Sequence, residues 1–139
     1  MKDWKSLYRP APEEQMVELP EKVIRHGRNP ENMGKISDAN GHSRVEGVCG
    51  DTMEMWIKVG PDGTVGEIGF MTDGCISSRA CGSVAACIAK GRDIDGIFEI
   101  SPADVLRELE GALEKHCAIL AVSTLHRAVA DYMLKTGKQ

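Results

Sequence analysis

The chain has few aromatic residues, no excess of basic charge and no long apolar run. Aromatic side chains make up 4% of its 139 residues, so aliphatic and small side chains must fill the core. A formal net charge of −4 leaves no basic surplus to displace counterions from phosphates. No stretch reaches the roughly 18 apolar residues that span a bilayer, and the N-terminus lacks the apolar region of a signal peptide. We therefore expect a cytoplasmic protein that binds neither nucleic acid nor membrane.

The number of cysteines also excludes a complete set of internal disulfides. The chain has five, so at least one has no partner, and in a reducing compartment structural disulfides are rare. Metal binding or thiol chemistry is the better interpretation. The five are Cys49, Cys75, Cys81, Cys87 and Cys117.

The length fits one domain. Residues 1–19 mix charges and prolines without a sustained period, so we predict a flexible N-terminal extension followed by a single domain over residues 20–137. Strand-forming residues are concentrated in three segments, of which the last two flank a tight turn at Pro61. They predict a three-stranded antiparallel meander over residues 42–48, 53–59 and 65–72.

Helical patterns flank this meander and follow it. The first helix should begin with Pro20 at its first position and stop at Gly27, and the last should close at Gly137. The turn-rich residues 29–41 are either an ordered loop or a mobile arm. Helices are predicted over residues 20–27, 77–90, 101–109 and 117–135. The predicted class is α+β, with helices, including a long C-terminal one, covering one face of the small sheet.

Topology brings the cysteines together. In a meander the first connection and the end of the third strand lie at the same end of the sheet, so Cys49 and Cys75 should be neighbours. Asp51 follows Cys49 across one glycine, and a tight turn there would direct both side chains to one point. His116 and Cys117 come at the start of the long helix, where the helix dipole favours an anion. This position should lower the Cys117 pKa from about 8.5.

The donor set indicates a labile metal site. Stable iron-sulfur clusters take four thiolates, whereas a carboxylate or an imidazole in place of one thiolate binds iron less tightly. Three thiols with Asp51 and His116 therefore fit a cluster that is built and released. The same donors bind Zn²⁺ tetrahedrally, so residue types alone leave iron and zinc open.

The sequence resembles a known family, the IscU-type scaffold proteins and the homologous N-terminal domain of NifU. The similarity runs from Glu21 to Met133. Its motifs are EKVIRHGRNPENMG at residues 21–34, CGD at Cys49–Asp51, TDGC at Thr72–Cys75 and HC at His116–Cys117. By this resemblance Cys49, Cys75 and Cys117 are the cluster ligands, Asp51 is the labile aspartate, and His116 is the histidine before the last cysteine.

The resemblance implies a mechanism and its partners. A cysteine desulfurase delivers sulfur as persulfide, with Cys117 as the receiving thiol, and iron enters the site. An electron donor such as a ferredoxin reduces the sulfur, and a transient [2Fe-2S] cluster passes to apo iron-sulfur client proteins. The chain would then be a scaffold and carrier and not an enzyme. A homodimer is left open, and Zn²⁺ is an alternative occupant of the purified form.

Two departures and two alternatives accompany this resemblance. The segment before the HC pair lacks the LPPVK-type sequence that recruits an Hsp70 chaperone, so we do not expect cluster release by that route. The N-terminal extension is also longer than in simple scaffolds.

The main alternative is a zinc-dependent sulfurtransferase of the SufU type. That branch has an insertion between the second and third cysteines and lacks the histidine, whereas this chain has His116 and no insertion. A structural zinc module is the third reading.

The other cysteines and histidines are interpreted as structural. Cys81 and Cys87 lie on one predicted helix, and a small buried hydrophobe is the better account of both, with a metal or redox role for Cys81 left open. The remaining histidines have no paired ligand at metal-site spacing and are read as surface or packing residues. They are His26, His42 and His126.

Overall fold

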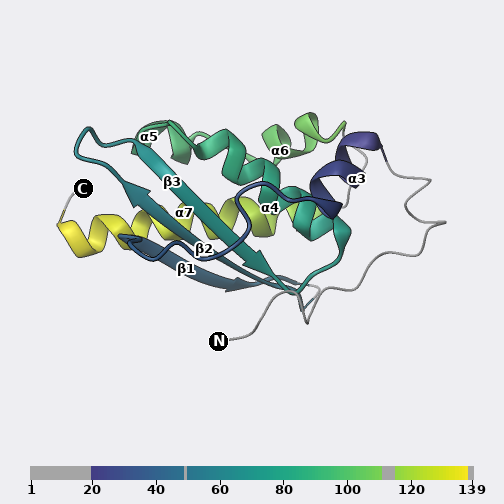
Figure 1. Ribbon diagram of the computed structural model, residues 1–139, viewed down its shortest axis with the longest axis horizontal. Helices are drawn as coiled ribbons and strands as arrows, with labels where there is room; N and C mark the ends of the chain where they lie inside the picture. The colour runs from purple at the N-terminus through teal and green to yellow at the C-terminus, as the bar shows by residue number, and fades with distance from the viewer. Residues whose placement is uncertain (1–19, 49, 111–114, 138–139) are drawn as a thin grey trace.

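A computed structural model describes residues 20–48, 50–110 and 115–137 of the chain. These residues form a three-stranded antiparallel sheet of order β1-β2-β3 and five helices (Figure 1), which confirms the predicted α+β class. The strands are β1 Gly41–Glu46, β2 Thr52–Val59 and β3 Val65–Thr72. The helices are α3 Glu21–Arg28, α4 Ile76–Ala89, α5 Ile94–Phe98, α6 Pro102–Glu108 and α7 Lys115–Thr136.

The sheet is the predicted meander. At one end Glu46 pairs with Thr52, and at that same end Met53 pairs with Thr72. The hairpin between β2 and β3 lies at the opposite end (Figure 1). Successive side chains of a strand point to opposite faces, and alternate residues of β2 are fully buried under the helices. These inward residues are Met53, Met55 and Ile57.

The helices cover one face of the sheet. The long helix α7 lies against β1 and β2, and α4 packs between β3 and α7 (Figure 1). Ser43 on β1 donates a hydrogen bond to the Thr124 carbonyl of α7 at 2.6 Å. By length and mean hydropathy α7 could cross a membrane, but 56% of its apolar window is buried within this fold. Packing against the sheet therefore accounts for its apolar character.

Two local expectations are wrong. The helix α3 does not stop at Gly27 but continues to Arg28. This glycine serves close packing, because an added Cβ would lie 2.1 Å from Ile76 Cγ1 of α4. No helix was predicted between residues 91 and 100, where the structure has α5, because five residues are too few to show a helical period. Asp93 caps this short helix by accepting a hydrogen bond from Gly96 N at 2.8 Å.

The turn-rich segment after α3 is an ordered loop. Met33 forms a parallel bridge with Phe70, Gly34 N donates to Phe70 O at 2.8 Å, and Phe70 N donates to Asn32 O at 3.0 Å. The loop therefore pairs with the outer edge of β3, which leaves that part of the edge without open hydrogen-bonding groups. The alternative of a mobile arm does not hold for these residues.

Candidate metal and sulfur site

Three segments meet at the end of the sheet where β3 finishes. They are the β1–β2 turn, the β3–α4 connection and the first turn of α7 (Figure 1). They carry the predicted site residues whose side chains are described, namely Asp51, Cys75, and His116 together with Cys117. Cys49 belongs to the β1–β2 turn but lies outside the described residues.

The β1–β2 turn holds Asp51 in place. Gly47 N donates to Asp51 O at 2.7 Å, and Gly50 N donates to Gly47 O at 3.0 Å. Gly50 has a φ of +89°, a backbone conformation that side chains other than glycine rarely adopt. The Gly at the centre of the CGD motif therefore allows the chain to reverse directly before Asp51.

The β3–α4 connection is tied to the start of β2. Thr52 N donates to Asp73 Oδ1 at 2.7 Å, and Thr72 Oγ1 donates to Thr52 O at 2.7 Å. Cys75 then occupies the N-cap position of α4 and is exposed. The connection thus sets an accessible thiol at the positive end of a 14-residue helix.

A buried hydroxyl joins the three segments. Ser78 Oγ donates to Asp51 Oδ2 at 2.8 Å and lies 3.7 Å from Cys117 Sγ. The Cys117 thiol in turn hydrogen-bonds the Cys75 sulfur. Ser78 therefore links the Asp51 carboxylate to the Cys117 thiol, and Cys117 in turn contacts Cys75. Thiols with one carboxylate are the residue types that bind a soft metal ion with one exchangeable oxygen ligand.

The two thiols have opposite acidities. The hydrogen bond from Cys117 lowers the pKa of Cys75 to about 5, assisted by the backbone N–H groups of Ser78 and Ser77. The same hydrogen bond and burial raise the pKa of Cys117, whose side chain is 3% exposed. The expectation that the helix start lowers the Cys117 pKa is therefore wrong, because the buried member of the pair keeps the shared proton.

His116 lies on the first turn of α7 next to Cys117 and is half-buried. Within the described part of the chain its imidazole makes no hydrogen bond or ion pair, so no contact there occupies its ring nitrogens. Metal ligation by His116 stays a prediction. Among the described residues, to which Cys49 does not belong, no group of three His, Cys, Asp or Glu side chains is arranged to hold a metal.

The remaining cysteines differ from the site pair. Cys81 is fully buried, and burial raises its pKa to about 12 with a further contribution from the charge of Cys75. Cys87 donates to Glu31 Oε2 at 2.8 Å, and burial and this contact raise its pKa to about 12. Both are protonated at neutral pH. Cys81 is the buried packing residue that the sequence predicts, whereas Cys87 is only half-buried and hydrogen-bonded, so the expectation of a buried residue is wrong for Cys87.

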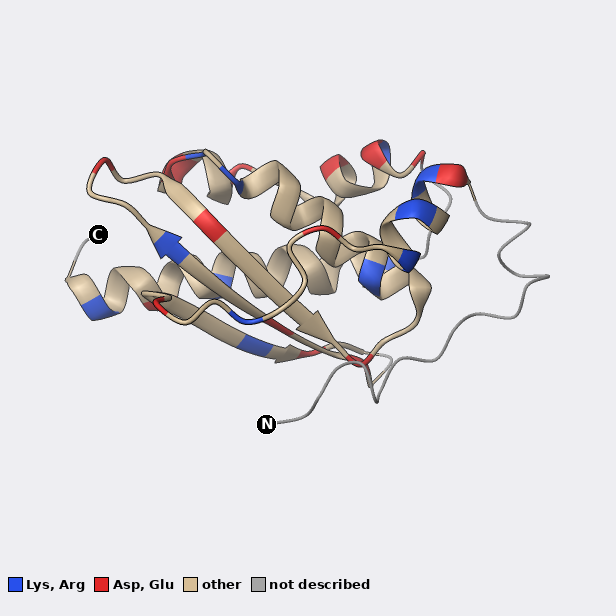
Figure 2. Ribbon diagram, in the orientation of Figure 1, with Lys and Arg blue, Asp and Glu red and all other residues tan. Residues whose placement is uncertain are grey.

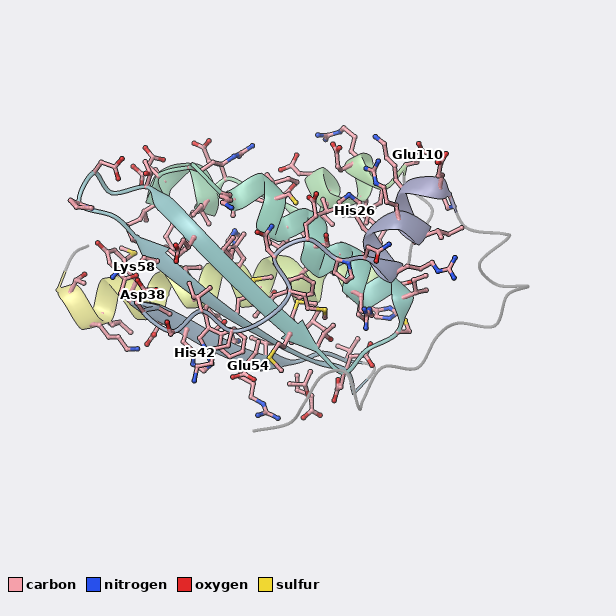
Figure 3. The ribbon with its side chains drawn as sticks, in the orientation of Figure 1. His26, Asp38, His42, Glu54, Lys58 and Glu110 are labelled. Carbon is pink, nitrogen blue, oxygen red and sulfur yellow. The ribbon has the colours of Figure 1, made fainter. Side chains whose placement is uncertain are left out.

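The remaining histidines make structural contacts. His26 Nδ1 hydrogen-bonds Ser83 Oγ at 2.7 Å between α3 and α4, and His42 Nε2 lies 2.7 Å from Glu54 Oε2 on the neighbouring strand (Figure 3). His126 donates to Ile97 O at 3.0 Å. Their interpretation as packing or surface residues is confirmed.

Basic residues border the site end of the molecule. Figure 2 shows them along α3, which packs on the start of α4 through Gly27 and Ile76. Arg25 and Arg28 are exposed. They place positive charge on the surface of α3 in a chain whose formal net charge is −4.

Sequence reasoning missed Ser78. It sits three residues after Cys75 in a helix and looks like an ordinary small helix residue. The signal available was Gly74, where an added Cβ would lie 2.7 Å from Asp51 Oδ2. A glycine before a ligand cysteine can indicate such a close approach, but its partners come from elsewhere in the chain.

The fold and the joined thiols and carboxylate define a small α+β domain for metal or sulfur handling. A family model described as the NifU-like N-terminal domain matches residues 18–139. The chain belongs to this family. It is 43% identical over 122 residues to the iron-sulfur cluster assembly scaffold protein IscU 1 of Archaeoglobus fulgidus, covering 85% of this chain and 78% of that protein.

A bacterial relative and a solved structure agree with this assignment. The iron-sulfur cluster assembly scaffold protein IscU of Escherichia coli K12 is 38% identical over 120 residues, which cover 83% of this chain and 94% of that protein. The crystal structure of a NifU-like protein (N-terminal) from Brucella abortus superposes with a TM-score of 0.70 at 15% identity, covering 84% of this chain and 94% of that one. The latter likeness concerns the fold alone.

Proposed function

We propose that this chain is a scaffold on which a labile [2Fe-2S] cluster is assembled and from which it passes to apo-proteins. The observation that carries the proposal lies at one end of the sheet, where Ser78 links Asp51 to Cys117 and Cys117 in turn contacts Cys75. Relatives at 38% and 43% identity are named iron-sulfur cluster assembly scaffold proteins, and this supports a scaffold function here.

The side chains divide the task by their chemistry. Cys75 presents an accessible thiolate for iron, and Cys117 supplies a second sulfur ligand from the buried side. Asp51 supplies an oxygen ligand, which binds the iron of a cluster more weakly than a thiolate does. This weaker bond favours release of the cluster. Cys49 and His116 complete the predicted ligand set, and Cys117 is the predicted acceptor of persulfide sulfur.

The proposal includes partners and a compartment. A cysteine desulfurase supplies sulfur, a donor such as a ferredoxin supplies electrons, and apo iron-sulfur proteins accept the cluster, all in the cytoplasm. The chain itself acts as a carrier and not as an enzyme. Zn²⁺ is expected to compete for the same donors in the purified protein.

Anaerobic reconstitution tests this function. The chain with ferrous iron, cysteine, a cysteine desulfurase and a reductant should develop the visible absorption of a [2Fe-2S] centre. Addition of an apo-ferredoxin should then move that absorption to the ferredoxin. The family resemblance predicts the persulfide on Cys117, and peptide mass spectrometry before iron is added tests this against Cys75, which is the accessible thiolate of the pair.

A different outcome would favour the sulfurtransferase reading. If the chain held only zinc, formed no cluster, and instead stimulated desulfurase turnover, the scaffold function would be wrong. The Cys117→Ser variant should lose the persulfide. The matched control is Cys87→Ser, which removes a cysteine outside the site and should keep the persulfide.

A further inference from the structure

Ser78 connects two groups on which the proposed site depends. Its side chain is fully buried, with Oγ 2.8 Å from Asp51 Oδ2 and 3.7 Å from Cys117 Sγ. A serine hydroxyl has one proton to donate, and an ionised carboxylate at the shorter distance is the stronger acceptor. Ser78 therefore fixes one Asp51 oxygen and leaves Oδ1 for another partner.

Gly74 serves the same contact. A Cβ on this residue would lie 2.6 Å from Ser78 Oγ and 2.7 Å from Asp51 Oδ2. Real Cβ atoms essentially never approach other heavy atoms this closely, so any side chain at this position would displace the pair. The serine and the glycine thus maintain one carboxylate position by different means, hydrogen bonding and the absence of bulk.

We propose that Ser78 is a positioning residue that holds the Asp51 carboxylate beside Cys117 in readiness for a metal ion. The inference rests on the proposed function for the identity of the cargo. Hydrogen bonds to a ligating carboxylate fix its orientation, and their loss weakens metal binding about 10- to 100-fold. Without the Ser78 hydroxyl, Asp51 would lose the one side-chain hydrogen bond that it makes within the described residues.

Titration with Co²⁺ alone tests this role without any assembly partner. The metal-free chain is titrated anaerobically, and the sulfur-to-cobalt absorption reports binding. Ser78→Ala should weaken Co²⁺ binding about 10- to 100-fold. In an Asp51→Ala background the same change should have no further effect, because the carboxylate that Ser78 positions is gone.

A merely structural role would give a different pattern. If Ser78→Ala weakened binding by the same factor with and without Asp51, or did not weaken it at all, the proposal would be overturned. Ser83→Ala is the matched control, since Ser83 is equally buried on α4 and bonds His26 Nδ1 at 2.7 Å and Glu31 N at 2.9 Å. An equal loss of Co²⁺ affinity in this control would also overturn the proposal.

A second variant covers the case in which Ser78→Ala does not fold. Gly74→Ala should separate Asp51 from Ser78 and weaken Co²⁺ binding to a similar extent, and wild-type affinity in this variant would count against the inference. The proposed function fails separately. The Ser78 and Asp51 substitutions could prove coupled in the Co²⁺ titration while the wild-type chain assembles no cluster. That result would refute the scaffold function and leave the positioning role of Ser78 in place.

Discussion

Cys75 and Cys117 share a proton unequally because only one of them faces water. Cys75 is exposed and receives hydrogen bonds from Cys117 and from the first backbone N–H groups of α4, so its thiolate is stabilised. Cys117 is buried, and a second negative charge beside the first would be unfavourable. Without metal the pair therefore carries one negative charge, which resides on Cys75.

Alkylation of the metal-free chain tests this assignment. A pKa of about 5 means that the Cys75 thiolate forms as the pH rises through that value. Its reaction with iodoacetamide should thus be nearly constant from about pH 6.5 to 8, whereas a thiol of pKa about 8.5 gains close to tenfold per pH unit there. Peptide mass spectrometry across this range gives the rate for each cysteine.

Cys87 is the internal control for that experiment. Its pKa is raised to about 12 by burial and by Glu31, so its alkylation should be slow and should increase with pH. Faster labelling of Cys87 or Cys117 than of Cys75 at pH 6.5 would contradict the unequal sharing.

At the scale of elements, the contact between α3 and α4 holds the first turn of α4, which carries Cys75 and Ser78. Gly27 of α3 lies directly against Ile76, the residue after Cys75, and Arg79 Nε of α4 donates to the Gly27 carbonyl at 2.9 Å. His26 adds its hydrogen bond to Ser83. The first turn of α4, which presents Cys75 and Ser78, is therefore held from the side of α3.

Gly27→Ala should destabilise the fold. Alanine favours a helix over glycine by about 1 kcal/mol. Here, however, the new Cβ would lie 2.1 Å from Ile76 Cγ1 and 2.9 Å from the Ile76 backbone oxygen, so α3 must move. Overpacking of this kind costs about 1–3 kcal/mol and should exceed the propensity gain. The free energy of unfolding in urea, followed by circular dichroism, measures the difference.

Gly66→Ala on β3 is the matched control, because an added Cβ there has nothing within 4 Å. It should leave the free energy of unfolding nearly unchanged. A Gly27→Ala variant as stable as this control would show that the two helices tolerate separation.

At the scale of the whole molecule, α7 is the element on which the others pack. It contacts β1, β2, α4, α5 and α6, and its inward side is built from small and aliphatic residues. This packing accounts for a core with few aromatic side chains, since small residues let helices approach closely. Phe70 and Tyr132 are among the few buried aromatics.

Deletion of residues 1–19 should leave this assembly intact. The family match begins at residue 18, and we predict that the domain begins at residue 20. The shortened chain should melt within about 2 °C of the full chain, which corresponds to less than about 1 kcal/mol. Thermal unfolding by circular dichroism measures this, and Co²⁺ affinity serves as the check on the site. A much larger drop would mean that the extension belongs to the folded domain.

Local signals in the sequence determined much of the fold. The helix that begins near residue 101, the end of α7 at Gly137 and the hairpin at Pro61 were all predictable, because each depends on neighbours within a few residues. The meander then followed, and with it the placement of Cys75 near the first connection. The family motifs indicated which cysteines to consider.

Only the tertiary structure decided how the site works. Ser78 bonds a residue 27 positions earlier and approaches one 39 positions later, and no local pattern indicates such partners. The acidity of the thiols was likewise decided by which of them is buried, a property of packing that reversed the expectation for Cys117. Turns and helix ends depend on residues that are neighbours in the sequence, whereas burial and long-range hydrogen bonds exist only once the segments have come together.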